Sequence, residues 1–152
     1  MLQKAKEILE KQIKTTIIDK PVKDEVDIET QRLLAFTKAN SGERACFIFG
    51  AECTVKANKN GIGGRNQHLG LNFLDKFRSK ATLLFAATDG VDGNSDAAGV
   101  VIETNSKSKD NSDAIRAYLR DFNSNLYFQK NKSLVVTGPT HNNLLDIIMM
   151  IL

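Results

Sequence analysis

The segment that most constrains this chain is a short apolar run at 83–87 followed directly by the loop TDGVDGNSDAAG at 88–99. The run is continuous and bounded by turn formers, which predicts a buried strand. The loop then places Asp89, Asp92 and Asp96 among flexible glycines. Ligands of open α/β sheets bind outside the carboxyl ends of the strands, so the sequence predicts a ligand site at this loop.

Two further loops combine glycine with polar residues at the junctions of predicted elements. Residues 61–67, GIGGRNQ, precede a helical pattern, and residues 137–143, TGPTHNN, follow the short apolar run 134–136. Each loop stands at the end of a strand or helix. We therefore predict that all three converge on one face of the sheet and form a single cleft.

Hydrophobic periodicity and turn formers predict alternating helices and strands along the chain. We expect helices over 2–13, 28–39, 66–78, 112–121 and 141–152. The second of these would be capped by Asp27, and the last is apolar on nearly every face. We expect a hairpin-like turn at Gly50, loops at 20–27 and 103–113, and strands over 15–18, 45–49, 53–57, 82–87, 99–102 and 133–136. The alternation predicts an α/β fold, a layered α/β/α domain with a mixed, mostly parallel sheet.

Composition narrows the class of protein. The length of 152 residues is typical of one domain, and the hydrophobic share of 41% is enough for a buried core. The charge of +3 is interspersed, without a basic block, so we expect no nucleic-acid binding. No stretch has the apolar length of a membrane span or of a signal peptide, so we expect no membrane association and a cytoplasmic location. Cys46 and Cys53 have neither disulfide nor metal-site spacing, and His68 and His141 lack a nucleophile or metal-ligand partner.

Arg65 is the first candidate for binding an anion. It follows Gly61, Gly63 and Gly64 at the start of a predicted helix. Glycines let a backbone approach an anion, the first helical turn offers free N–H groups, and a guanidinium grips phosphate or carboxylate with two parallel bonds. The alternative is a glycine-rich turn whose arginine pairs with a surface acid. Because Arg65 lies outside the apolar pattern of the helix, we expect Arg65→Ala to leave the fold intact.

The acidic loop offers a second set of candidates. Asp89 and Asp92 have the chemistry to hold Mg²⁺ through one or two carboxylates, or to orient or deprotonate a substrate hydroxyl. Asp-Gly is also common turn chemistry, which is the alternative for both residues. Asp96 has a rival role as the N-cap of a helix at Ala97.

The third loop offers hydroxyl and amide groups. Thr137 and Thr140 flank Gly138 before the predicted last helix, whose N-terminus would present its N–H groups to a phosphate. The alternative is an ordinary capped helix start, with Thr140 or Asn142 as the cap. Asn143 either completes the lining of the site or caps the same helix.

These loops carry a family resemblance. The motifs GGRNQ at 63–67, TDGVDGNSDAAG at 88–99 and VTGPT at 136–140 resemble, in order and spacing, the MOFRL domain. That domain is the C-terminal part of glycerate 2-kinases, enzymes often named hydroxypyruvate reductases. Residues 47–55, FIFGAECTV, resemble the family's strand, Gly-Gly-Glu turn and second strand. We therefore expect a single domain over 1–152, with a helix–strand–helix lead-in at 1–44 and a MOFRL-like core at 45–152.

The resemblance implies transfer of a phosphoryl group from ATP to D-glycerate with Mg²⁺. It implies that Arg65 holds the glycerate carboxylate or the transferring phosphate, and that Asp89 and Asp92 position the metal or the hydroxyl. Further substrate and phosphate contacts are expected from Gly61, Gly63, Gly64, Asn66, Thr88, Asp96, Thr137, Gly138, Thr140, Asn143 and Glu52. A reductase would need a nicotinamide site, and the sequence has no dinucleotide fingerprint.

The chain departs from the family at several points. Ala51 and Ala87 replace glycines, and His141 replaces a small residue. Family enzymes also carry a long N-terminal domain that forms one wall of the cleft, and this chain lacks it. We therefore expect no appreciable kinase activity from the chain alone, and expect it to act with a separate N-terminal kinase domain or by self-association. The alternatives are a non-catalytic anion- or nucleotide-binding or interaction module that acts only with a separate N-terminal chain, and an inactive remnant.

Overall fold

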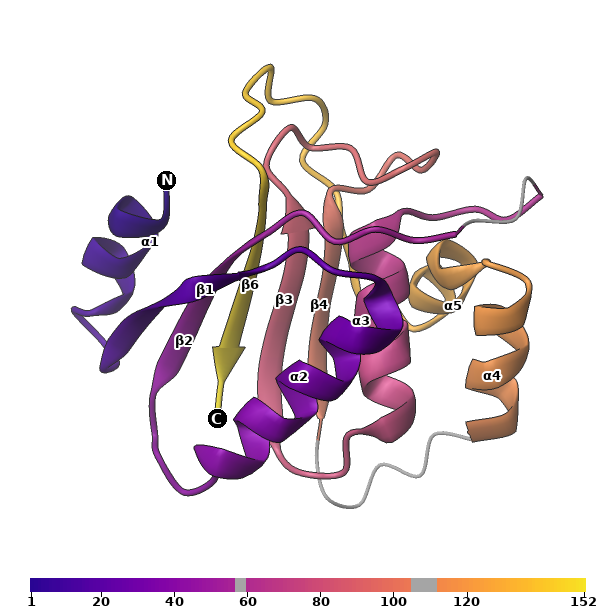
Figure 1. Cartoon of the computed structure of the whole chain (residues 1–152). Coiled ribbons are helices and arrows are strands. Elements are labelled where there is room, and N and C mark those ends of the chain that lie inside the picture. Colours follow the sequence, from indigo (N-terminus) through magenta and orange to yellow (C-terminus); the bar gives the residue numbers. More distant parts are fainter. Residues whose placement is uncertain (57–59, 105–111) are drawn as a thin grey trace.

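The computed structural model describes residues 1–56, 60–104 and 112–152, in which one twisted sheet carries helices on both faces (Figure 1). The elements, in chain order, are α1 (Leu2–Leu9), β1 (Thr15–Val22), α2 (Val26–Ala39), β2 (Cys46–Ala51), α3 (Arg65–Lys76), β3 (Ala81–Ala87), β4 (Gly99–Thr104), α4 (Ser112–Arg120), α5 (Ser124–Lys130), β5 (Leu134–Val135) and β6 (Asp146–Ile151). Among the described residues, no helix is both long and apolar enough to cross a membrane.

The sheet has the strand order β1-β2-β6-β3-β4-β5. The predicted α/β class and the mixed character of the sheet are confirmed. The prediction that the sheet is mostly parallel is wrong: among the described strands β1 and β2 pair in parallel, and the other four strand pairs are antiparallel. The antiparallel pairings arise because β6 enters the sheet between β2 and β3, and because β3 is followed directly by β4.

The last segment of the chain is the largest departure from the sequence prediction. The helix predicted over 141–152 is wrong, since Asp146–Ile151 form the central strand β6. Ile148 pairs with Phe49 of β2 and with Phe85 of β3, and is fully buried. A strand buried on both faces is a continuous apolar run, which periodicity does not distinguish from a buried helix.

Smaller corrections concern the first half of the chain. β1 continues to Val22, so the predicted loop at 20–27 is shorter. Glu25 occupies the N-cap position of α2, so the predicted Asp27 cap is wrong. β2 runs through Gly50, and the strand predicted after it is reduced, in its described part, to one parallel bridge at Thr54, so the hairpin-like turn predicted at Gly50 is wrong.

Two predicted segments lie partly outside the described residues. The strand at 53–57 ends in residue 57, and the loop at 103–113 is described only where it belongs to β4 and α4. The first helix ends at Leu9 rather than at residue 13, and α5 was not predicted.

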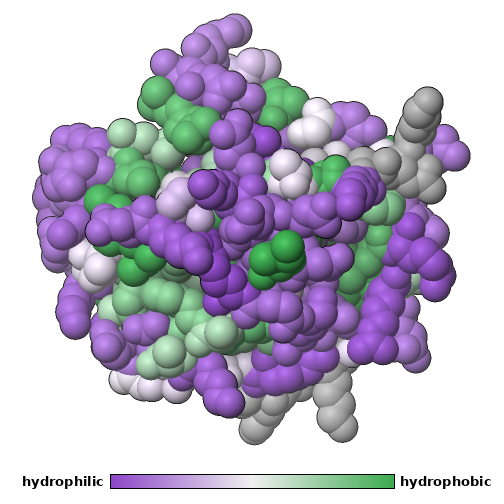
Figure 2. All heavy atoms as spheres, in the orientation of Figure 1, coloured by the Kyte–Doolittle hydropathy of each residue, from purple (hydrophilic) through white to green (hydrophobic). Residues whose placement is uncertain are grey.

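Alternating strand residues divide the core in two. Phe47 and Phe49 face a large cluster under α2, α3, α4 and α5, whereas Cys46 and Ile48 face a smaller one under α1. The outward side of the helices that cover the larger cluster is mostly hydrophilic (Figure 2). The packing fixes the N-terminus of α3 beside the ends of β2, β3 and β6, which is where the candidate site lies (Figure 1).

Candidate functional site

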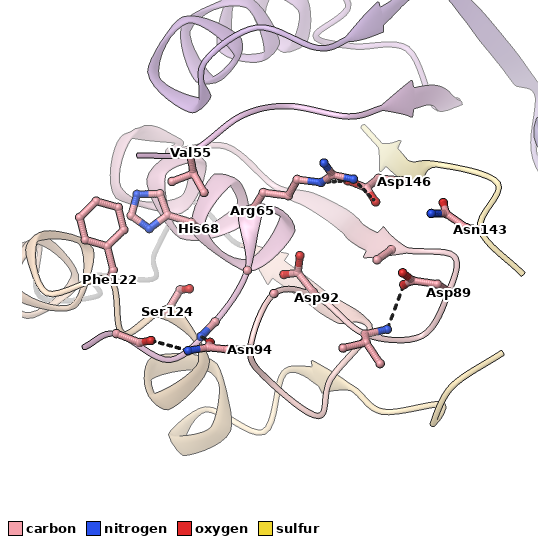
Figure 3. A pocket seen from close by; sticks show the side chains of 16 residues that line it. Val55, Arg65, His68, Asp89, Asp92, Asn94, Phe122, Ser124, Asn143 and Asp146 are labelled. Carbon is pink, nitrogen blue, oxygen red and sulfur yellow. Dashed lines mark hydrogen bonds and ion pairs between the residues drawn. The ribbon is translucent and has the colours of Figure 1, made fainter. Parts of the chain in front are cut away.

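The three glycine-bearing loops meet at this edge of the sheet and line a cavity of about 580 Å³ (Figure 3). They are joined to one another directly. The N–H of Gly63 donates to Asn94 Oδ1 at 2.9 Å, and Asn94 Nδ2 donates to the carbonyl of Gly61 at 2.8 Å. The N–H of Thr140 donates to the carbonyl of Asp89 at 2.8 Å. The predicted convergence of the loops is confirmed.

The cavity is lined by some of the predicted site residues and not by others. Those that line it are Gly61, Gly63, Gly64, Arg65, Asp89, Asp92 and Asn143. Those outside its lining are Glu52, Asn66, Thr88, Asp96, Thr137, Gly138 and Thr140.

Arg65 is the first residue of α3 and reaches across the cavity to Asp146, the first residue of β6 (Figure 3). Its Nε donates to Asp146 Oδ2 at 2.6 Å and its Nη2 to Oδ1 at 3.3 Å. Burial alone would lower the pKa of Arg65, but the hydrogen bond and charge of Asp146 outweigh it and raise that pKa. A guanidinium has five N–H donors, and the other three have no acceptor among the described residues.

The partner of Arg65 is a buried acid rather than a surface one. Asp146 is only 2% exposed. Removing the guanidinium would leave its carboxylate buried without the ion pair, which is unfavourable. The expectation that Arg65→Ala leaves the fold intact therefore needs correction, because Arg65 is both available to a ligand and structurally engaged.

Asp92 occupies the N-terminus of α3. Its buried carboxylate accepts four hydrogen bonds: from the backbone N–H and Nδ2 of Asn66, both at 3.1 Å, and from the N–H and Nε2 of Gln67 at 2.8 and 3.0 Å. Burial raises the pKa of Asp92, and these hydrogen bonds oppose the rise. Two of the helix N–H groups that were expected to bind phosphate thus donate to Asp92 instead. The side chain of Asn66 also donates to Asp92 and does not line the cavity.

The glycines serve close packing between loops. A Cβ on Gly64 would lie 2.3 Å from Asp92 Oδ1, and one on Gly90 would lie 2.1 Å from the carbonyl oxygen of Gly138. Gly90 also has a φ of +89°, which favours glycine. The predicted role of such glycines was to let an anion approach the backbone, but here they let neighbouring loops approach each other.

Two backbone donors remain at the start of α3. In the described part of the chain, no group accepts a hydrogen bond from the N–H of Gly64 or of Arg65. They lie beside the cavity, next to the free donors of the Arg65 guanidinium. Together they form a compact candidate site for one phosphate or carboxylate group.

Asp89 is the carboxylate most available to a ligand. It lines the cavity, and its Oδ1 accepts the N–H of Val91 at 3.1 Å while Oδ2 has no donor among the described residues. Asp92 does not fit the role of a magnesium ligand, because both of its oxygens are engaged. Residues 1–56, 60–104 and 112–152 contain no cluster of three metal-ligating side chains. A Mg²⁺ ion here would have Asp89 as its protein ligand and complete its shell with waters and substrate oxygens.

Thr88 and Thr140 join the second loop to the third. Thr140 Oγ1 donates to the carbonyl of Thr88 at 2.5 Å. Thr88 Oγ1 donates to the carbonyl of Leu145 at 2.6 Å and accepts the N–H of Leu144 at 2.9 Å. Both hydroxyls are therefore committed to the loops themselves.

The third loop is followed by strand β6 and not by a helix. The prediction that the N-terminus of a helix over 141–152 binds phosphate is therefore wrong. Thr137 is exposed and its Oγ1 donates to the carbonyl of Gly138 at 2.9 Å. Asn143 does line the cavity. Asp96 is exposed, and no helix begins at Ala97, so its predicted N-cap role is also wrong.

Glu52 directly follows β2 and is exposed. Its charge is close enough to contribute to the raised pKa of Arg65, although it lies outside the cavity lining. Its influence on the site is therefore electrostatic.

Sequence reasoning did not assign several residues that line the cavity. Asp146 was hidden in the segment predicted as a helix. Asn94 lies in the acidic loop between two candidate aspartates. Nothing in the sequence indicated that its side chain bonds to the backbones of Gly61 and Gly63. His68 and Phe122 stack with ring centroids 4.8 Å apart and planes 9° apart, a contact between α3 and the α4–α5 turn. That contact carried no sequence signal.

The fold and these motifs identify the family. Residues 45–146 match the model of the MOFRL family, and the chain belongs to that family. The division into a lead-in at 1–44 and a core at 45–152 stays a prediction.

Several relatives are glycerate kinases, and one is named a putative hydroxypyruvate reductase. A D-glycerate 2-kinase of Thermotoga maritima is 38% identical over 109 residues, which cover 69% of this chain and 26% of the relative. A glycerate 2-kinase of Picrophilus torridus is 37% identical over 105 residues, 68% of this chain and 24% of the relative. The crystal structure of a glycerate kinase from Thermotoga maritima superposes with a TM-score of 0.84 at 30% identity, over 99% of this chain and 39% of that one. This chain thus spans about a quarter of the length of the curated relatives it matches.

Proposed function

We propose that this chain supplies one wall of a glycerate 2-kinase site, at which ATP phosphorylates D-glycerate with the help of Mg²⁺. The observation that carries the proposal is the Arg65 guanidinium, which faces a cavity built by the three family motifs and keeps N–H donors free. Phosphoryl transfer depends mainly on positioning and on stabilising negative charge. A rigid arginine beside open backbone N–H groups suits both tasks.

In this proposal Arg65 holds the glycerate carboxylate or the transferring phosphate. Asp146 fixes the guanidinium side-on through two bonds, so its remaining donors point in a defined direction. Preorganised donors of this kind need no reorganisation when charge develops in the transition state. Asp89 then either orients the substrate hydroxyl or binds Mg²⁺ through its free oxygen.

The charges of the cavity explain why we expect the chain to be inactive alone. Among the residues that the structure describes, its lining contains one guanidinium, that of Arg65, and three acidic side chains, those of Asp89, Asp92 and Asp146. Such a wall does not by itself attract a triphosphate. The missing positive charge would come from Mg²⁺ and from the rest of the kinase, as a separate chain or a second copy.

A complementation assay tests the proposal. The chain is combined with the part of Thermotoga maritima D-glycerate 2-kinase that lies outside the aligned region, and ADP release is followed with D-glycerate, ATP and Mg²⁺. We expect turnover with both parts present and none with either alone. Strong turnover from the chain alone would refute the half-site view, and no turnover from correctly associated parts would favour a binding module or an inactive remnant.

Arg65→Lys and Arg116→Ala make a matched pair for this assay. Lysine keeps the charge at 65 but loses the planar fork, so we expect at least about a hundredfold loss of turnover from a folded protein. Arg116 also pairs with a buried aspartate, Asp75 at 3.3 Å, but lies outside the cavity. Arg116→Ala should therefore leave turnover close to that of the parent.

A further inference from the structure

The cavity has two chemically different ends (Figure 3). One end holds the Arg65–Asp146 ion pair. The other is formed by Val55, His68 and Phe122, which come from three different parts of the chain. The first end suits an anion. The second offers aromatic and aliphatic surface, which suits a flat, uncharged group.

Phe122 occupies an unusual backbone conformation. It lies in the turn between α4 and α5 with a φ of +54°. The turn is held by hydrogen bonds from the N–H of Phe122 to the carbonyl of Leu119 at 3.2 Å and from Asn123 to Tyr118 at 2.9 Å. Glycine or asparagine adopts this conformation with less strain than a bulky residue does. The backbone therefore does not explain a phenylalanine here, whereas a role for its ring would.

His68 completes this aromatic end. Its ring stacks in parallel on that of Phe122, and its Nδ1 is buried without a hydrogen-bond partner among the described residues. Burial lowers the pKa of His68, so the imidazole is neutral at pH 7. The residue lies one turn after Arg65 on α3, which separates the two along the helix axis by about 4.5 Å.

We propose that the Val55–His68–Phe122 end binds the planar purine base of a nucleoside triphosphate, whose phosphates extend toward Arg65. This inference rests on the proposed function, because it assigns a position to the nucleotide in that same site. A volume of about 580 Å³ lies within the usual range of small-molecule sites. Uncharged aromatic surface binds bases through stacking and offers no counter-charge to phosphate. The aromatic end thus suits the base, and Arg65 suits the phosphates at the other end once Mg²⁺ offsets the charge of the aspartates there.

Saturation-transfer NMR on the wild-type chain with ATP and Mg²⁺ tests the contact directly. We expect the adenine H2 and H8 protons to receive more saturation than the ribose protons. We also expect Phe122→Asn, which removes the ring but suits the positive φ, to weaken ATP binding about tenfold. The affinity for tripolyphosphate, which has no base, should not change in the same Mg²⁺ buffer. Phe122→Leu is the second variant, because it keeps apolar volume without the ring.

Leu145→Asn is the matched control. Leu145 is an exposed apolar residue that also has a positive φ, +69°, but it does not line the cavity. Its variant should bind ATP like the parent. The proposal is overturned if wild-type protein transfers no saturation to adenine, or if the folded Phe122 variants lose ATP and tripolyphosphate equally or lose neither. Kinase activity in the complementation assay without any adenine contact would show that the base site fails while the proposed function stands.

Discussion

The role of Asp92 leads to a quantitative prediction about stability. Asp92→Ala removes the acceptor of two backbone N–H groups at the start of α3 and of two side-chain amides, all from Asn66 and Gln67. Loss of a helix N-cap costs about 1 kcal/mol, and each buried donor left unpaired costs about 1–3 kcal/mol. Relaxation around the small side chain offsets part of this. We expect a loss of about 3–4 kcal/mol in the free energy of unfolding.

Thermal and urea unfolding of the isolated chain measure this loss. For a domain of this size, 1 kcal/mol corresponds to about 2–4 °C, so Tm should fall by about 6–16 °C. Asp89→Ala is the matched control, because Asp89 accepts a single hydrogen bond from the described residues, from the N–H of Val91, and is only half-buried. It should cost less than about 1 kcal/mol. An Asp92→Ala variant that melts within 2 °C of the parent would refute the capping role and make that carboxylate available for catalysis or metal binding.

Two further predictions concern Arg65 and His68. We expect Arg65→Ala to lose about 1–3 kcal/mol of stability, less than for a fully buried pair because its side chain is 36% exposed, and Asp146→Asn in the same chain should restore much of it. Urea unfolding of the two single variants and the double variant measures the coupling, and strictly additive losses would contradict it. Because the pKa of His68 is lowered in the folded protein, the unfolded chain takes up this proton first as the pH falls below 6.5. The contribution of His68 to the free energy of unfolding is therefore complete above pH 6.5 and is lost as the pH falls from there toward the lower pKa of the folded state. His68→Phe should flatten this part of the pH profile, whereas a profile unchanged by the substitution, or altered equally by His141→Asn in the exposed loop, would be inconsistent with a buried neutral imidazole.

The place of the site was predictable from the sequence because it depends on element ends. Glycine and polar residues after 83–87, before the helix at 66–78 and after 134–136 marked three junctions, and the structure brings them together. What the sequence did not reveal is how the loops are joined. Asp92 and Gln67 are 25 residues apart, and Arg65 and Asp146 are 81 apart. No local pattern announces such pairs.

The misassigned last segment shows a second limit. DIIMMI at Asp146–Ile151 lies at the centre of the sheet, so both of its faces are covered and neither alternation nor a helical stripe is present. Its short length and its isoleucines favoured a strand. The helix prediction also hid the role of Asp146. As the first residue of a strand paired with β3, Asp146 lies at the edge of the sheet where the cleft was predicted.

Several residues that the sequence indicated as ligand contacts instead hold the loops around the cavity together. Asp92, Thr88 and Thr140 are occupied by contacts between loops, and Gly64 and Gly90 permit those contacts. The loops that form the cleft are therefore held in place by contacts with one another. Ordering loops on binding would reduce affinity, and a preformed wall avoids that cost. If the proposed function holds, we expect any closure during phosphoryl transfer to come from the part of the kinase that faces this wall, while the wall holds its own free groups in position.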